Sequence, residues 1–185
     1  MLRATELAHL LMLQSVEPGD RVVDATVGNG HDTLFLAELV GPRGRVFGFD
    51  VQEAALAATA ERVVELPQVT LIHAGHETLE EHLATHGEDR LAAVMFNLGY
   101  LPGAPKDIMT RTETTLVALE QALARIKIHG LVTLVLYPGH QGGDEEAAAV
   151  RSYAQALPQA YAVTRYARMN SAEPAPELIA IERLS

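Results

Sequence analysis

The sequence predicts an α/β protein: a doubly wound, mostly parallel seven-stranded sheet with an antiparallel hairpin at one edge. Short β-rich runs alternate with stretches whose apolar residues recur at helical spacing. Such alternation is typical of parallel strands joined by right-handed helical crossovers. The last two β-rich runs are separated only by a short polar loop with two prolines, which favours a hairpin.

The first half of the chain supplies three predicted strands, each followed by a helix. A helix over residues 3–14 comes before them, and Pro18-Gly19-Asp20 ends it. We expect Asp32 or Thr33 to cap the helix after the first strand, because short polar side chains favour that position. The strands are predicted at 21–26, 45–50 and 69–73, and the later two helices at 53–66 and 78–86.

The second half supplies four more predicted strands. Leu91–Asn97 and Leu131–Tyr137 are near-continuously apolar, as strands buried on both faces are. Between them, Thr112–Ile126 is predicted to form an amphipathic helix. No linker or internal repeat interrupts the order, so residues 1–185 are predicted to form a single domain. The remaining elements are a helix at 144–157 and strands at 161–168 and 177–183.

Composition excludes several classes of protein. The chain has no cysteine, which excludes disulfides, thiolate zinc sites and thiol nucleophiles. No apolar run approaches the roughly 20 residues of a membrane helix, and the N-terminal stretch lacks a signal-peptide pattern, so we expect a cytoplasmic protein with no membrane contact. The formal net charge of −10 argues against broad, nonspecific nucleic-acid binding, but it leaves binding at one structured RNA site open.

Acidic residues flank a glycine turn where the first two strands end. Asp24 precedes Gly28-Asn29-Gly30, and Asp50 ends the second strand. The third glycine of a dinucleotide-binding fingerprint is missing, and Asp24 beside the turn and Asp32 near the helix start would repel a pyrophosphate. The same charges suit a ligand with a sulfonium and an α-amino group, which favours S-adenosylmethionine over NAD. The alternative is a generic strand–helix turn with a capping Asp.

The pattern D-x-x-x-G-x-G, with an acid ending the second strand, resembles motifs I and II of class I methyltransferases. The strings VDATVGNGHDTLFLA, GFDVQEAAL, FNLGYLPG and YPGHQGG together resemble the rRNA methylase family, over about residues 20–185. One branch of that family methylates the wobble 5-aminomethyl-2-thiouridine of tRNA. The resemblance implies a Rossmann-like domain, S-adenosylmethionine as cofactor, no metal, and tRNA as the substrate.

The resemblance also assigns the parts of the cofactor to residues of this chain. The resemblance implies contacts to the methionine part from Asp24, Gly28, Asn29 and Gly30, to the ribose from Asp50 and Val51, and to the adenine from Gly75 and His76. For His76 the alternative is a surface histidine at a helix start.

The fourth strand ends in Asn97-Leu98-Gly99-Tyr100, which resembles the N-P-P-Y loop of amine methyltransferases with both prolines replaced. In that loop the Asn accepts hydrogen bonds from the target nitrogen and the aromatic ring packs on the substrate. Loss of the prolines argues against a planar exocyclic base amine and leaves an alkyl amine possible. An alkyl ammonium must be deprotonated before it can attack. His140 is a candidate base, and bulk water is the alternative. Asn97 and Tyr100 could instead serve a turn and the core.

Two other classes of function stay open at this point. The chain could methylate rRNA or a small molecule, as its acidic charge suggests, or it could be a non-catalytic cofactor-binding RNA module, as the lost prolines suggest. Exposed edges of such sheets often pair, so a homodimer is compatible with the prediction. The sequence does not determine the methyl acceptor, the base or the oligomeric state.

Overall fold

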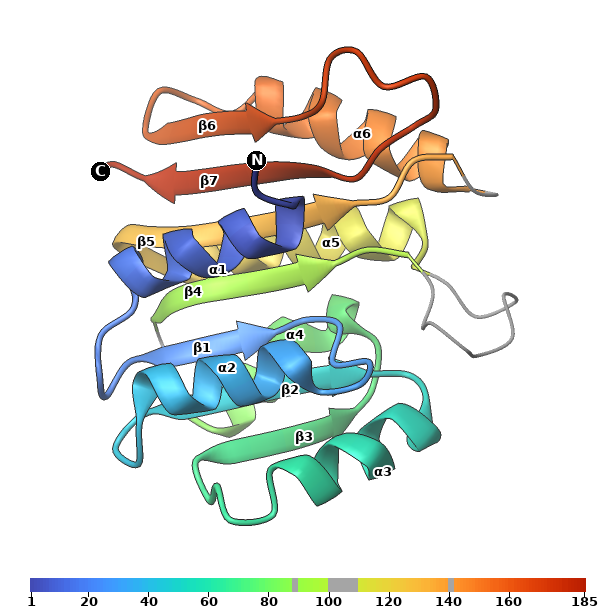
Figure 1. Ribbon diagram of the computed structural model, residues 1–185. Helices are drawn as coiled ribbons and strands as arrows, with labels where there is room; N and C mark the ends of the chain where they lie inside the picture. The colour runs from blue at the N-terminus through green and yellow to red at the C-terminus, as the bar shows by residue number, and fades with distance from the viewer. Residues whose placement is uncertain (88–89, 100–109, 140–141) are drawn as a thin grey trace.

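The chain forms a seven-stranded sheet with helices packed on both faces (Figure 1). The computed structural model describes residues 1–87, 90–99, 110–139 and 142–185. The strands are β1 (Arg21–Asp24), β2 (Arg45–Asp50), β3 (Val69–His73), β4 (Leu91–Asn97), β5 (Ile126–Leu136), β6 (Tyr161–Tyr166) and β7 (Glu177–Arg183). The helices are α1 (Ala4–Ser15), α2 (His31–Val40), α3 (Glu53–Arg62), the 3-10 turn η1 (His76–Thr78), α4 (Leu79–Thr85), α5 (Thr112–Arg125) and α6 (Gly143–Gln155).

The strand order confirms the predicted fold class. The sheet runs β3-β2-β1-β4-β5-β7-β6, in which β1 to β5 are parallel and β7 is antiparallel to both of its neighbours. The chain winds outward from β1 to β3 and then returns through β4 on the other side of β1. In an open α/β sheet, such a reversal leaves a crevice at the carboxyl ends of the central strands, where ligands bind.

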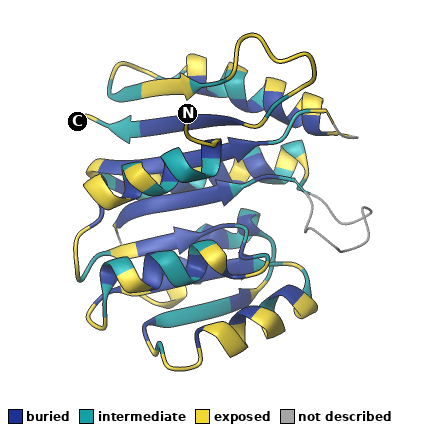
Figure 2. Cartoon of the chain, in the orientation of Figure 1, coloured by how far each residue is buried: buried dark blue, intermediate teal, exposed yellow. Residues whose placement is uncertain are grey.

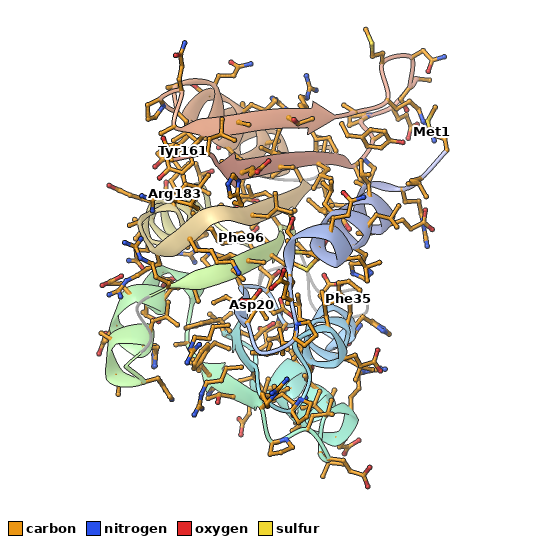
Figure 3. All side chains as sticks on the ribbon, turned by 90° about the vertical axis from the view of Figure 1, so that its left-hand side faces the viewer. Met1, Asp20, Phe35, Phe96, Tyr161 and Arg183 are labelled. Carbon is orange, nitrogen blue, oxygen red and sulfur yellow. The ribbon has the colours of Figure 1, made fainter. Side chains whose placement is uncertain are left out.

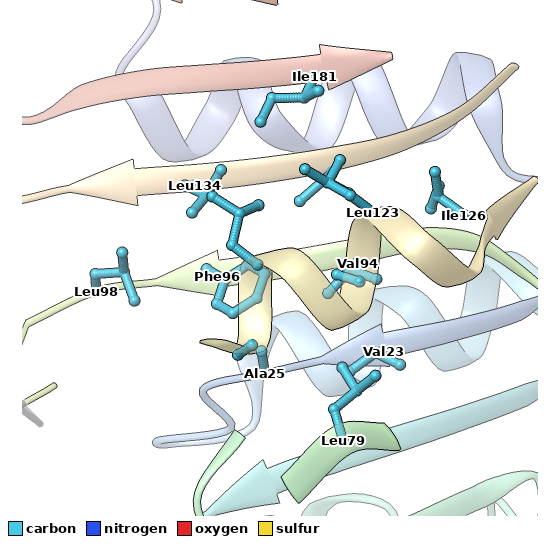
Figure 4. Close-up of a cluster of buried hydrophobic side chains, with 14 of the residues drawn as sticks. Val23, Ala25, Leu79, Val94, Phe96, Leu98, Leu123, Ile126, Leu134 and Ile181 are labelled. Atoms are coloured by element: carbon cyan, nitrogen blue, oxygen red, sulfur yellow. The ribbon is translucent and has the colours of Figure 1, made fainter. Parts of the chain in front are cut away.

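Two separate cores lie on the two faces of the sheet. One packs α4, α5 and α6 against side chains such as Val23, Phe96 and Ile181. Figure 4 shows part of this core, with these three side chains among those labelled. The other packs α1 and α2 against Val22 and Val46. Figure 2 shows the central strands buried beneath these helices. Full burial of a large apolar side chain stabilises a fold by about 1.5–3 kcal/mol, so these two layers hold the sheet edge that forms the crevice.

The boundary between α5 and β5 differs from the predicted one. Helix α5 ends at Arg125 rather than Ile126, and β5 begins at Ile126 rather than Leu131. Ile126 pairs with Leu91 of β4, and a register shift between Leu91 and Ala93 absorbs the left-handed residue His129 (φ 61°). The sequence pattern did not predict a strand over residues 126–130, because this segment contains polar residues and forms a strand only through pairing with β4.

Helix α2 does not use the predicted side-chain cap. It begins at His31, and its N-cap is Gly30 in the left-handed conformation (φ 75°). Asp32 and Thr33 therefore lie inside the first turn, and their side chains are free to bond across to other elements. Helix α3 also ends earlier than predicted, at Arg62, because the chain turns there toward β3.

The two ends of the strands differ in what they carry. Asp20 precedes β1 at the amino edge, on the side of the molecule that faces the viewer in Figure 3. There it bonds Lys127 and the Glu17 amide.

Through the described parts of the chain, we find no helix that combines the length and apolarity needed to span a membrane.

Candidate functional site

A cleft of about 1140 Å³ opens at the carboxyl ends of the central strands. It lies where the strand order reverses between β1 and β4, as the doubly wound topology requires. Most of the residues predicted from the sequence to bind a ligand line this one cleft. They are Gly28, Asn29, Asp50, Val51, Gly75, His76 and Asn97.

The glycine turn between β1 and α2 forms one wall of the cleft. Gly28 (φ 51°) and Gly30 (φ 75°) both have positive φ, and the Gly30 amide donates to the Val27 carbonyl at 2.8 Å. Helix α3 supports the turn from outside. The Thr59 hydroxyl donates to the Gly28 carbonyl at 3.2 Å, and the Arg62 guanidinium donates to the Asn29 carbonyl at 3.0 Å. The turn is thus held open to a ligand by contacts on its far side.

Gly30→Ala is expected to weaken cofactor binding at least tenfold, because a Cβ there would lie 2.5 Å from the Thr59 hydroxyl oxygen. Gly41→Ala is the matched control. Gly41 has a similar φ of 64°, but its Cβ would meet no atom within 4 Å. Calorimetric titration of both variants with S-adenosylmethionine checks the prediction. Equal losses of affinity in the two variants would mean that backbone strain, and not the Thr59 contact, governs the turn.

Asp50 ties the second strand to the glycine turn. One of its carboxylate oxygens accepts the Gly28 amide hydrogen at 2.8 Å, and the other accepts the Gln52 amide hydrogen at 2.9 Å. Each oxygen keeps a further lone pair, so the carboxylate can also accept hydroxyl groups from within the cleft. Val51 lies beside it, 56% exposed.

Asp24 lies beneath the turn and is fully buried. It accepts hydrogen bonds from the Thr33 hydroxyl at 2.6 Å and from the Thr26 amide at 3.1 Å. Burial raises its pKa to about 7, and the neighbouring Asp32 carboxylate adds to the rise. This geometry makes Asp24 a support for the turn and a charge below the cleft. Direct contact between Asp24 and a ligand stays a prediction.

The affinity for a cationic cofactor is expected to rise about tenfold between pH 6 and pH 8, if ionised Asp24 is the form that favours the cation. The sign follows from the raised pKa. Near pH 6 most Asp24 is neutral, and its negative charge appears only as the pH passes about 7. Calorimetry across this range checks the prediction, and Asp24→Asn should flatten the curve. An affinity that falls with rising pH would contradict it.

His76 is buried, at 7% exposure, and is not the surface histidine of the alternative interpretation. Its Nδ1 lies 3.1 Å from the Ala25 carbonyl oxygen, which can only accept, so Nδ1 carries the proton. Nε2 is then a lone-pair acceptor, and it has no partner among the described residues. Burial lowers the pKa of His76, which keeps the ring neutral. The ring packs edge-on against Phe96, with centroids 5.7 Å apart.

Asn97 lies at the end of β4 and lines the same cleft as the glycine turn. Its backbone amide donates to the Thr26 hydroxyl oxygen at 2.7 Å. Its side-chain Nδ2 donates to Asp32 at 2.6 Å, and its Oδ1 accepts the Tyr137 hydroxyl hydrogen at 3.1 Å. Three parts of the chain therefore converge on Asn97, with Thr26 holding its backbone and Asp32 and Tyr137 holding its side-chain amide.

Three residues that hold Asn97, directly or through a neighbour, were not predicted to belong to the site. Asp32 was expected only as a helix cap or a nearby charge, and Tyr137 only as the end of a strand. No role was predicted for His9 of α1, yet its Nε2 lies 2.7 Å from Asp32. The strand ends offered one usable signal, because the carboxyl ends of parallel strands share an edge. Tyr100 and His140 lie outside the described residues, so their roles stay predictions.

Similar proteins are found by sequence. A family model described as "Putative rRNA methylase" matches residues 46–182, well over half of the chain. A curated relative from Arabidopsis thaliana, named tRNA (mnm(5)s(2)U34)-methyltransferase, chloroplastic, is 39% identical over 167 residues. That alignment covers 84% of this chain but only 60% of the relative's length.

Similar solved structures cover the whole chain. The crystal structure of a "putative rRNA-methylase" from Clostridium thermocellum is 40% identical, with a TM-score of 0.95 over 100% of this chain and 99% of that one. The crystal structure of "a putative methyltransferase" from Streptococcus mutans, in complex with SAH, is 35% identical, with a TM-score of 0.89 over 100% of this chain and 99% of that one. Together with the family model that matches most of the sheet, these similarities show that the chain belongs to the rRNA methylase family.

Proposed function

We propose that this chain is an S-adenosylmethionine-dependent N-methyltransferase that acts as one domain over residues 1–185. Its proposed acceptor is the 5-aminomethyl group of wobble 2-thiouridine in tRNA. One observation carries the proposal. The acid-flanked glycine turn and Asn97 face the same cleft, so a cofactor and an amine acceptor can meet there.

The cleft fits the cofactor in charge and in hydrogen-bonding capacity. Asp50 offers free carboxylate lone pairs for the ribose hydroxyls, next to Val51. His76 Nε2 is a buried acceptor without a partner among the described residues, and an exocyclic adenine amine is a donor that would satisfy it. Gly75 lies beside it, and Gly28 and Asn29 would hold the methionine part. When bound, the cofactor supplies an electrophilic methyl group on a positively charged sulfur.

Asn97 is the proposed acceptor-binding residue. Its Oδ1 keeps a lone pair beyond the one that Tyr137 uses, and this lone pair can accept an N–H from an incoming amine. Such a bond orients the nitrogen lone pair toward the methyl group, and alignment of this kind can supply several kcal/mol of the barrier reduction. The amine must first lose a proton, and His140 or water stays the predicted acceptor of that proton.

A second hollow supports an RNA substrate. It measures about 270 Å³, and Pro138 lines both this hollow and the cleft. Arg151, Arg165 and Arg168 line it. Buried Glu177 pairs with the first two, at 2.5 and 2.6 Å, which fixes their guanidinium groups in place. Arginines held rigidly beside a cleft suit contacts to phosphates, so a structured RNA can bind despite the net charge of −10.

The decisive experiment is methyl transfer onto tRNA isolated from a strain that lacks this protein. Purified protein and methyl-labelled S-adenosylmethionine should convert aminomethyl to methylaminomethyl 2-thiouridine, as read by nucleoside mass spectrometry. Ribosomal RNA from the same strain is the parallel substrate, because the family description names rRNA. Label in rRNA alone would replace the tRNA assignment, and cofactor binding without transfer to either RNA would favour a non-catalytic module.

The location and assembly of the protein stay predictions. The Arabidopsis relative is named as chloroplastic. For this chain we propose a cytoplasmic location, which fractionation would test. A homodimer is also proposed, and light scattering of the purified protein would decide between one and two copies.

A further inference from the structure

We infer that Asp32 and His9 are positioning residues, which fix the orientation of the Asn97 amide so that its carbonyl oxygen faces the methyl acceptor. The inference rests on the function proposed above. It goes further because it assigns a role in catalysis to the N-terminal helix α1, which lies before the region that the family model matches.

The orientation of the Asn97 amide follows from the chemistry of its neighbour. An ionised carboxylate can only accept hydrogen bonds, so the amide must turn its NH₂ group toward Asp32, at 2.6 Å. The carbonyl oxygen then points the other way, where it accepts from Tyr137 and keeps a free lone pair. A neutral amide at position 32 could accept or donate, so it would tolerate either orientation of the Asn97 amide. In one of these two orientations the Asn97 NH₂ group would face the incoming amine, which needs a hydrogen-bond acceptor for its own N–H.

The charge of Asp32 also strengthens the Asn97 carbonyl as an acceptor. Hydrogen bonds to a charged group are roughly twice as strong as neutral ones, and bonds in a chain polarise one another. The Asp32 side chain is only 13% exposed, so solvent screens this effect little. Donation from Nδ2 to the carboxylate pushes electron density onto Oδ1, which is the atom that would hold the amine.

His9 fixes the carboxylate in turn. Its Nε2 lies 2.7 Å from one Asp32 oxygen, while Asn97 bonds the other. The His9 ring stacks on Phe35 of α2, with centroids 4.1 Å apart and planes 6° from parallel. The small buried face of α1, formed by Ala4, Ala8 and Met12, lets this helix approach the sheet closely. His9, Asp32 and Asn97 therefore form one chain of contacts from α1 to the acceptor.

A double-mutant cycle between Asp32→Asn and Asn97→Ala tests the inference. Asp32→Asn alone should lower kcat about 10- to 100-fold, the effect of losing a charge-assisted bond, with little change in cofactor Kd. In the Asn97→Ala background the same change should have almost no further effect, because Asp32 acts through Asn97. His9→Phe keeps the stacking on Phe35 but loses the contact to Asp32, so it should lower kcat. His9→Gln keeps an N–H donor for Asp32, so its kcat should lie between those of His9→Phe and the unchanged protein.

His129→Gln is the matched control, because His129 pairs with Glu182 far from the cleft and is 74% exposed at its side chain. Thermal unfolding of every variant separates misfolding from loss of rate. If Asp32→Asn lowers kcat by the same factor with and without Asn97, the two residues act independently and the inference is wrong. If Asn97→Ala itself leaves transfer intact, the proposed acceptor site fails instead, so the two failures are distinguishable.

Discussion

Asn97→Ala is expected to lower kcat for methyl transfer about 100-fold or more, with cofactor Kd changed less than about threefold. The variant removes a side-chain amide that lines the cleft and is held at both ends, its NH₂ group by Asp32 and its carbonyl by Tyr137. The amine can still enter, but nothing aligns its lone pair. Single-turnover transfer with labelled S-adenosylmethionine measures the rate, and calorimetry measures the affinity.

Gln68→Ala is the control for Asn97→Ala. Gln68 is also a buried amide, and its Nε2 donates to the Ala37 carbonyl at 3.2 Å next to the amino end of β3. The control should lose stability but keep kcat, because it lies away from the cleft. Rates that fall equally in both variants would show that loss of a buried amide, and not loss of alignment, explains the effect.

Asp50→Ala is expected to raise the cofactor Kd roughly 10- to 100-fold, because hydrogen bonds to a charged group contribute about 1.5–3 kcal/mol. Two effects add. The variant loses the carboxylate lone pairs that would accept the ribose hydroxyls, and it frees the Gly28 amide, which now anchors the glycine turn. Titration calorimetry measures Kd, while kcat at saturating cofactor should fall much less.

Asp20→Ala provides the matched control for Asp50→Ala. Asp20 also bonds a loop amide, that of Glu17 at 2.8 Å, and it pairs with Lys127 at 2.8 Å, but at the amino edge of the sheet (Figure 3). Its loss should lower the free energy of unfolding and leave Kd alone. An unchanged cofactor Kd in Asp50→Ala would mean that this carboxylate does not contact the cofactor.

The sequence was sufficient for those features that arise from neighbouring residues. The alternation of strand and helix patterns predicted the order of the elements and the antiparallel edge, since each pattern reports which face of its own element is buried. The turn around Gly28 and Gly30 was predictable because positive φ is a local requirement that glycine meets without strain. Asp50 followed from its place at the end of a strand.

Only the tertiary structure decided which side chains meet in the cleft. His9, Asp32, Asn97 and Tyr137 lie far apart in the sequence, and it takes packing of α1 and α2 on the sheet to bring them into one chain of hydrogen bonds. The start of β5 and the full burial of Asp24 depend in the same way on partners from distant segments. Local patterns specify an element and its buried face, whereas the pairing of elements sets the position, the charge state and the hydrogen-bond partner of each side chain.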